Sequence, residues 1–354
     1  MTQALALRSM LRQAGVTVCV VLVGQSRYRS VPAFFKEQID APLLTIDSPG
    51  FVTDDDQQAV RLGATIARTL PQWTNFARTV DTLDQLFNTL KPDLLINFYE
   101  PVVSRYYQHR RPDFPMVCVG HQYLALQPDF PFPSGAFWQR RLFTRYTAWT
   151  ALHADRCLAL SFYPTPAEST DRLTVVPPLL RPSVFDLPLD RSEDFVLVYL
   201  VNHGYAEAVR QWHHQHLDVP LRVFWDHPEA PDLQVEDPTL MFYRIHDRSF
   251  LDLMARCRSL VCTAGFESIC EALYLGKQVL AVPVSGHYEQ ACNALDALRT
   301  GAVCTATTFD IDQLLRRSLI RRSDPAPFRA WVAEAEHRIL TALLETADPA
   351  CPVY

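Results

Sequence analysis

The sequence contains no run of about 18 apolar residues, and its first residues lack the basic and then apolar order of a secretory signal. We therefore expect neither a membrane-spanning helix nor a segment that directs export. Long basic runs are absent as well, and 33 Lys and Arg are outnumbered by 39 Asp and Glu, which gives a formal net charge of -6. This balance disfavours nucleic acid as a partner.

Paired cysteine motifs are also missing. The nine cysteines include no C-x-x-C pair, and most of them lie in apolar segments typical of buried strands. This pattern indicates reduced core thiols rather than disulfides or a zinc site, and it favours the cytoplasm as the location of the chain. His213, His214 and His216 have no cysteine or carboxylate at ligand spacing, so we interpret them as a solvated helix end and expect no metal.

The length and order of the segments predict two domains. A chain of 354 residues, 48% of them hydrophobic, is long enough to bury two cores of ordinary size. Strand-like and helix-like segments alternate along both halves, as a doubly wound parallel sheet requires. A proline-rich segment without glycine follows Pro177 and separates the halves. We predict an N-terminal domain over 1–180, a linker over 181–192, a C-terminal domain over 193–324 and a closing helical segment over 325–354.

Several element boundaries follow from apolar spacing. The spacing predicts a helix over residues 2–14 and a buried strand over 16–23. A further helix is predicted over 55–90, with an interruption at Pro71. Residues 325–344 have the pattern of one helix.

The most informative stretch covers residues 260–303. A short apolar strand ends at Cys262, a turn of small residues follows, and a helix begins at about Phe266. A strand that enters a helix through such a turn leaves backbone N–H groups where an anion can bind. Glu267 and Glu271 are four residues apart and share one face of that helix. The second carboxylate is one turn further on, at the distance of a ribose whose phosphates rest on the turn, so the stretch predicts half of a nucleotide site.

The order of short motifs over this stretch resembles the donor-binding signature of GT-B glycosyltransferases. The motifs are small-Gly-x-Glu-Ser-x-x-Glu-Ala from Ala264, Gly-Lys-x-Val from Gly276, Glu-Gln-x-x-Asn-Ala from Glu289 and a final Gly-Ala at Gly301. The chain is most similar to the lipid-linked N-acetylglucosaminyltransferases of peptidoglycan synthesis and their uncharacterised relatives. The alternative is an ordinary strand and helix unit with two solvent-facing glutamates.

This resemblance implies an α/β fold of the GT-B type, in which two doubly wound Rossmann-like domains face a cleft. It also implies that Glu271 holds the ribose of a nucleotide sugar, and that Gln290 and Asn293 face the sugar or its phosphates. Gly204, at a strand-to-helix turn, is a second candidate phosphate site. The full set of expected donor-binding residues is Asn202, His203, Gly204, Ile245, His246, Thr263, Ala264, Gly265, Phe266, Glu267, Ser268, Glu271, Glu289, Gln290 and Asn293.

The first half offers two candidate catalytic bases. Ligands of such sheets bind beyond the carboxyl ends of strands, which singles out His121 and Glu100. Imidazole titrates near neutrality and can take a proton from an attacking hydroxyl. The similar family has His-Glu-Gln at this strand end, whereas this chain has His-Gln-Tyr; the alternative is that His121 only forms hydrogen bonds to its loop. Pro101 predicts a rigid turn that fixes Glu100.

The beginning of the chain departs from the family. There, a central strand and a Gly-rich turn that ends in Gly-His precede the segment matched here by Thr2 to Leu7. We therefore expect the first domain to lack its first strand. Our hypothesis is that Met1 corresponds to an internal methionine, which the reading frame upstream would test.

A basic and aromatic helix is predicted over residues 137–152. Four large apolar side chains fall near one helical face and three arginines lie around them. Two interpretations stay open: contact with an anionic membrane surface, or a core stripe with the arginines in solvent. The residues concerned are Trp138, Leu142, Tyr146, Trp149, Arg140, Arg141 and Arg145.

The resemblance implies a hexosyltransferase that moves a sugar from a nucleotide-diphosphate donor, expected to be a UDP-sugar, to a hydroxyl acceptor that is lipid- or envelope-linked. No Asp-x-Asp occurs in the second-half cleft region, so we expect helix N-termini rather than a metal to stabilise the leaving diphosphate, and no cofactor. Two rivals remain: a nucleotide-sugar epimerase of the same fold, which needs no acceptor, and a non-catalytic nucleotide-sugar-binding subunit. A cytoplasmic enzyme at the inner membrane face is expected.

Overall fold

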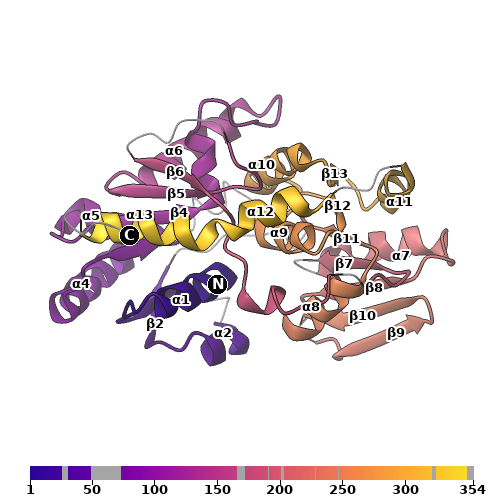
Figure 1. Cartoon of the computed structure of the whole chain (residues 1–354), viewed down its shortest axis with the longest axis horizontal. Coiled ribbons are helices and arrows are strands. Elements are labelled where there is room, and N and C mark those ends of the chain that lie inside the picture. Colours follow the sequence, from indigo (N-terminus) through magenta and orange to yellow (C-terminus); the bar gives the residue numbers. More distant parts are fainter. Residues whose placement is uncertain are drawn as a thin grey trace.

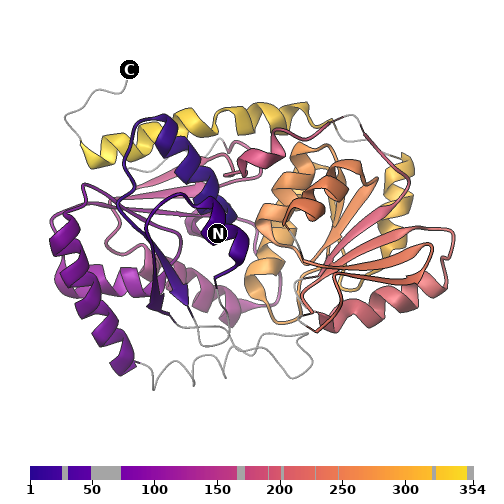
Figure 2. The same cartoon turned by 90° about the horizontal axis from the view of Figure 1, so that it is seen from below.

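The computed structural model describes residues 1–25, 31–48, 73–165, 172–189, 191–200, 203–227, 229–245, 247–320 and 324–348. Figure 1 shows two halves side by side, with the C-terminal helices lying across both. Figure 2 shows the same arrangement after a quarter turn, so the contact of these helices with both halves is not an effect of one view.

The second half is built on one seven-stranded sheet in the order β13-β12-β11-β7-β8-β10-β9. Neighbouring strands are parallel except β9, which pairs antiparallel with β10 at the edge. Helices separate most of the parallel strands and cover the sheet, so β11 and β12 are fully buried and β7 is buried except at Tyr199. The strands are β7 (Val196–Leu200), β8 (Leu221–Trp225), β9 (Leu233–Asp237), β10 (Leu240–Arg244), β11 (Ser259–Cys262), β12 (Gln278–Ala281) and β13 (Val303–Thr305).

The helices of this half alternate with most of its strands along the chain. They are η4 (His203–Tyr205), α7 (Ala206–His214), α8 (Asp247–Arg256), α9 (Phe266–Tyr274), α10 (Tyr288–Ala297), η5 (Leu298–Thr300) and α11 (Ile311–Ile320). The carboxyl ends of β7, β10 and β11 lie at one edge of the sheet, where η4, α8 and α9 begin. This edge is where an α/β sheet binds ligands.

The first half contains two separate parallel sheets, β1-β2 and β3-β4-β5-β6. Among the described residues, β1 pairs only with β2, and β3 pairs only with β4. The strands are β1 (Val21–Gln25), β2 (Leu43–Asp47), β3 (Leu95–Asn97), β4 (Met116–Gly120), β5 (Arg156–Leu160) and β6 (Leu173–Val176). The helices are α1 (Thr2–Gln13), α2 (Ala33–Gln38), α4 (Trp73–Leu90), α5 (Pro101–Arg110), η2 (His121–Leu126) and α6 (Phe137–Thr150), and η3 (Pro182–Val184) lies in the linker.

Some sequence-based boundaries are wrong. The strand predicted over 16–23 begins only at Val21, because its pairing with Leu43 to Asp47 of β2 sets its length. The predicted 55–90 helix is described as α4, and its residues before 73 lie outside the described residues.

The helix predicted over 325–344 divides into α12 (Ala326–Ala333) and α13 (Ala335–Ala347). Glu334 lies at the break, and the bend lets α12 contact α9 while α13 contacts β5 and β6. The chain thereby joins its two halves a second time, after the linker.

His213 is not part of a solvated helix end. It is buried, and its Nε2 lies 3.1 Å from the Thr239 hydroxyl, because α7 packs its inner face against the sheet. Strand β9 was not predicted at all: it is an edge strand with mostly exposed or half-buried residues, so no apolar run marks it.

One continuous apolar core connects the two halves. Leu158 and Leu160 of β5 belong to the same buried cluster as Ile269 and Leu273 of α9 and Ile339 of α13. The core therefore fixes α9 at the junction between the halves. The predicted glutamates lie on this helix.

Candidate functional site

The turn from β11 to α9 is the centre of the candidate site. Ala264 has a φ of 43°, a left-handed conformation that is unusual for a residue with a side chain. Asn293 of α10 donates from Nδ2 to the Ala264 carbonyl at 3.2 Å and so supports the turn from behind. Gly265 is the N-cap residue of α9, and no side chain caps the helix there. The first amides of α9 are therefore directed to the edge of the sheet without a side-chain acceptor.

Thr263 contributes a second polar group to this turn. Its hydroxyl is buried, and it has no hydrogen-bond partner in the part of the chain that the structure describes. Buried hydroxyls normally have partners, since an unsatisfied one costs about 1–3 kcal/mol. The uncapped helix and the unpaired hydroxyl together suit an anion that accepts hydrogen bonds.

The two glutamates of α9 lie in different surroundings. Glu267 is partly exposed in the first turn of the helix. Glu271 is only 2% exposed, and both its carboxylate oxygens accept from Arg181, at 2.6 Å from Nε and 2.8 Å from Nη2. Arg181 lies in the linker just before η3 and is buried as well. The predicted ribose carboxylate is thus already held by the segment that joins the halves.

Sequence reasoning missed Arg181. The sequence gives only a weak signal for it: Arg181 is a charged residue that directly follows the apolar pair Leu179 and Leu180 and precedes Pro182. A charge that is buried in such a segment requires a partner of opposite sign, but the sequence does not say which one.

Gln290 and Asn293 form hydrogen bonds to the backbone of the neighbouring loops. Both are buried, and Gln290 accepts from the Val284 amide through Oε1 at 2.8 Å. This bond holds the loop between β12 and α10, while Asn293 holds the turn before α9. Their side chains fix the shape of the predicted donor site from inside.

Glu289 connects the two halves directly. Its Oε1 accepts from Gln122 Nε2 of η2 at 2.9 Å, across a sequence separation of 167 residues. Burial raises the pKa of Glu289 to about 7; the Gln122 bond opposes the shift and the nearby Glu267 carboxylate adds to it. The result is a carboxyl group that titrates near neutral pH at the contact between the halves.

His121 is enclosed rather than open to solvent. It is 4% exposed, its ring stacks on Phe266 with centroids 4.2 Å apart, and its Nδ1 lies 2.8 Å from the Leu160 carbonyl. Its Nε2 faces Asp296 Oδ2 at 3.7 Å. Burial lowers the pKa of His121, and Asp296 partly opposes this. These contacts agree with the interpretation in which His121 forms hydrogen bonds to neighbouring backbone.

Glu100 is the N-cap residue of α5. Its Oε1 accepts from the Val102 amide at 3.2 Å and from the Ser48 hydroxyl at 2.8 Å. Pro101 is the first residue of that helix, so the predicted rigid turn is present. Burial raises the pKa of Glu100, although the two hydrogen bonds oppose the shift. The carboxylate lies beside Gly24 of β1, where an added Cβ would be 2.2 Å from Oε2.

The remaining predicted donor residues lie at the same sheet edge. His203 and Gly204 follow β7, which pairs with β11, so their turn lies next to that of Thr263. Ile245 follows β10, and its amide donates to the Trp225 carbonyl at 3.3 Å. Asn202 and His246 lie outside the described residues.

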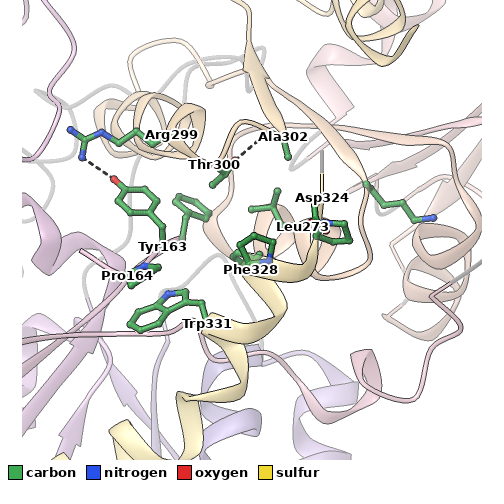
Figure 3. A pocket seen from close by; sticks show the side chains of 13 residues that line it. Tyr163, Pro164, Leu273, Arg299, Thr300, Ala302, Asp324, Phe328 and Trp331 are labelled. Atoms are coloured by element: carbon green, nitrogen blue, oxygen red, sulfur yellow. Dashed lines mark hydrogen bonds between the residues drawn. The ribbon is translucent and has the colours of Figure 1, made fainter. Parts of the chain in front are cut away.

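A pocket of about 220 Å³ opens elsewhere, between the halves and α12. Figure 3 shows Arg299 directed toward the Tyr163 hydroxyl, with Phe328 and Trp331 on the other wall. The Arg299 and Tyr163 side chains are hydrogen-bonded at 3.0 Å. None of the predicted site residues lines this pocket, so it belongs to the joint between the halves and not to the candidate site.

Two further properties bear on the kind of site. Among the described residues, no group of three or more His, Cys, Asp and Glu side chains is arranged to hold a metal ion. No described helix has the length and apolar character needed to cross a membrane.

Comparison with known proteins gives a family. The family model described as glycosyl transferase family 1 matches residues 34–320. No curated protein matches the chain at a significant level.

Solved structures of similar fold cover almost the whole chain. The glycotransferase of kitacinnamycin has 16% identity and a TM-score of 0.65 over 98% of this chain and 95% of that one. MurG of Acinetobacter baumannii has 14% identity and a TM-score of 0.56, over 97% and 95%. UGT89C1 of Arabidopsis thaliana, complexed with UDP, has 16% identity and a TM-score of 0.60, over 98% and 96%. These similarities confirm the predicted GT-B fold.

Proposed function

The chain belongs to glycosyl transferase family 1 and is a glycosyltransferase, and from this premise we propose that it moves a sugar from a nucleotide-diphosphate donor, a UDP-sugar, to a hydroxyl acceptor. The observation that carries the proposal is the turn before α9, where an uncapped helix N-terminus and the unpaired Thr263 hydroxyl meet. Both groups favour a diphosphate.

In this proposal the donor binds at the sheet edge of the second half. The diphosphate lies on the amides of Gly265 to Ser268, with Gly204 beside them. Glu271 takes the ribose hydroxyls, and Arg181 holds its carboxylate in one orientation. A carboxylate has about four acceptor positions and Arg181 uses two, which leaves the others for ribose. Ile245 covers the base, while Glu289, Gln290 and Asn293 shape the sugar pocket.

The reaction forms a bond between the acceptor oxygen and the anomeric carbon and breaks the bond from that carbon to the diphosphate. The helix N-terminus stabilises the negative charge that develops on the leaving diphosphate, so no metal is needed for this step. Glu100 takes the hydroxyl proton: it is less buried than His121, and its raised pKa makes it a better base at neutral pH. His121 acts as a positioning residue behind Phe266.

The acceptor in this proposal is lipid- or envelope-linked, and the enzyme acts in the cytoplasm at the inner membrane face. This class of acceptor is what the resemblance of the motifs between Ala264 and Ala302 to the lipid-linked N-acetylglucosaminyltransferases implies. The cysteines in the described part of the chain are all free thiols, which suits that compartment.

Calorimetric titration with UDP, TDP, GDP and ADP tests the donor site. We expect one diphosphate to bind, and Thr263→Val to weaken it about tenfold or more, because a hydrogen bond to a charged phosphate is lost. The matched control is Ser259→Ala, which removes another buried, unpaired hydroxyl at the opposite end of β11 and should bind normally. A folded protein that binds none of the four nucleotides contradicts the proposal.

A further inference from the structure

The outer face of α6 exposes large apolar side chains. Phe137 is 62% exposed, Trp138 is 75% exposed and Leu142 is 41% exposed. The rings of Phe137 and Trp138 pack on each other with centroids 5.2 Å apart, so they form one apolar surface. Contiguous exposed apolar side chains in a folded protein often mark an interaction surface, whereas single exposed ones are normal.

Two arginines lie on the same face. At about 100° per residue, Phe137, Arg141, Arg145, Trp138 and Leu142 fall within an arc of about 140°. We call these five residues the α6 face. Both arginines are exposed, and within the described part of the chain no salt bridge involves either of them. Arg140 is different, because it lies off the arc and packs over the Phe132 ring at 4.1 Å.

The opposite face of α6 is the one that packs. Thr147 and Thr150 are buried, and the Thr147 hydroxyl is 2.7 Å from the Tyr99 hydroxyl. Phe143 contacts Tyr288 at the start of α10, with ring centroids 5.7 Å apart. The core-stripe interpretation therefore fails for Trp138 and Leu142.

The inner face of α6 lies close to the proposed site. Tyr99 directly precedes Glu100, and Tyr288 directly precedes Glu289. The helix thus has one side at the contact between the halves and the other in solvent, and Figure 1 shows it at the periphery of the molecule, above β5 and β6.

We propose that the α6 face docks the protein on a bilayer that contains anionic lipids. An apolar arc with aromatic rings buries in the headgroup region while arginines on the same arc extend to lipid phosphates. The face carries no acidic residue, so its charge is complementary to such a surface in a chain that is acidic overall. The docking is argued from the exposure and the charge of this face. Its use, which is to bring a lipid-linked acceptor to the site beside Tyr99, rests on the proposed function.

Sedimentation with vesicles tests the docking. Vesicles of phosphatidylcholine with phosphatidylglycerol should retain the full-length protein at low salt, and vesicles of phosphatidylcholine alone should retain much less. Arg141→Gln with Arg145→Gln should weaken binding to the anionic vesicles about 25-fold, at about fivefold for each arginine, and remove the lipid preference. Phe137→Ala with Trp138→Ala should weaken binding to both vesicle types at least about tenfold.

Matched controls lie on other faces. Arg12→Gln with Arg316→Gln removes two exposed arginines from elsewhere, and Leu233→Ala with Val235→Ala removes two exposed apolar groups of β9. Both controls should bind vesicles as the unaltered protein does.

Three results would overturn the proposal: no retention of the unaltered protein, equal losses in the controls, or α6-face variants that dissociate a dimer in gel filtration while vesicles retain nothing. Titration of the same samples with UDP separates the two claims. Normal nucleotide binding without vesicle binding refutes only the docking, and vesicle binding without nucleotide binding refutes only the proposed donor site.

Discussion

The two halves of the molecule differ in how they use their polar residues. In the second half, the α9 N-terminus has no side-chain cap, and the Thr263 hydroxyl has no hydrogen-bond partner among the residues that the structure describes. In the first half, Glu100 caps α5 and His121 is bonded to backbone, so both candidate bases already have structural partners. This difference indicates that the proposed donor side offers free polar groups to a ligand, whereas the polar groups of the proposed acceptor side already bind other parts of the fold. Arg181 and Gln122 connect the two.

The largest effect is expected from Glu100→Gln. If Glu100 takes the acceptor proton, its amide cannot replace it, and the transfer rate should fall about 10²–10⁴-fold. The amide oxygen still accepts from Val102, so the melting temperature should change little. Initial-rate measurements give the transfer rate, and thermal melts give the melting temperature. Loss of stability without a specific loss of rate would show that Glu100 is only a cap, and the two halves would then differ even more.

Arg181→Ala should cost about 3–5 kcal/mol in the free energy of unfolding, because it leaves the Glu271 charge buried without a partner. Urea denaturation measures this. Arg244→Ala is the control, since it removes an exposed ion pair with Asp232 and should cost about 0–1 kcal/mol.

The double variant Arg181→Met with Glu271→Leu should recover most of the stability, because it removes both charges, yet it should not bind UDP. Equal costs for Arg181→Ala and Arg244→Ala would contradict the buried pair, and normal UDP binding by the double variant would contradict the role of Glu271.

A pH-dependent effect is expected from Glu289. Its pKa is about 7 in the folded protein and 4.5 ordinarily, so between these values the folded state keeps a proton that the unfolded state has lost. Stability therefore falls as pH rises through this window. The difference in unfolding free energy between Glu289→Gln and the unaltered protein should change from about pH 4.5 to about pH 7 and stay constant above it. A pH-independent difference would contradict the raised pKa.

The smallest effect is expected from Gln122→Ala. It removes one hydrogen bond to a carboxylate between the halves, which costs roughly 1–2 kcal/mol. Because that bond lowers the pKa of Glu289, its loss should move the titration to higher pH. The same pH series measures the shift. Gln211→Ala is the control, because Gln211 and its hydrogen-bond partner Glu207 are both exposed on α7. A downward shift would contradict the assigned contact.

The central part of the second half can be predicted from the sequence, because it depends on residues that are close together in the chain. The strand that ends at Cys262, the small-residue turn and the spacing of Glu267 and Glu271 specify a turn and a helix face without reference to the rest of the chain. The strand β11 and the helix α9 accordingly lie where the motifs predict them, whereas the exposed edge strand β9 and the short strand β13 were not predicted.

The pairings across the chain could not be predicted. Arg181 and Glu271 are 90 residues apart, and only the path of the linker past α9 brings them together. The same holds for Gln122 with Glu289 and for the enclosure of His121 by Phe266. Sequence spacing supplies neighbours within an element, whereas burial and charge partners come from how the elements pack.

The most direct test of the central claim is hydrogen exchange with and without saturating UDP. If the diphosphate rests on the α9 N-terminus, amides of Gly265 to Ser268 should exchange more slowly with UDP than with UMP, while those of α5 in the first half should not respond. Protection that is absent from this turn, or that is the same for UMP and UDP, would contradict the account.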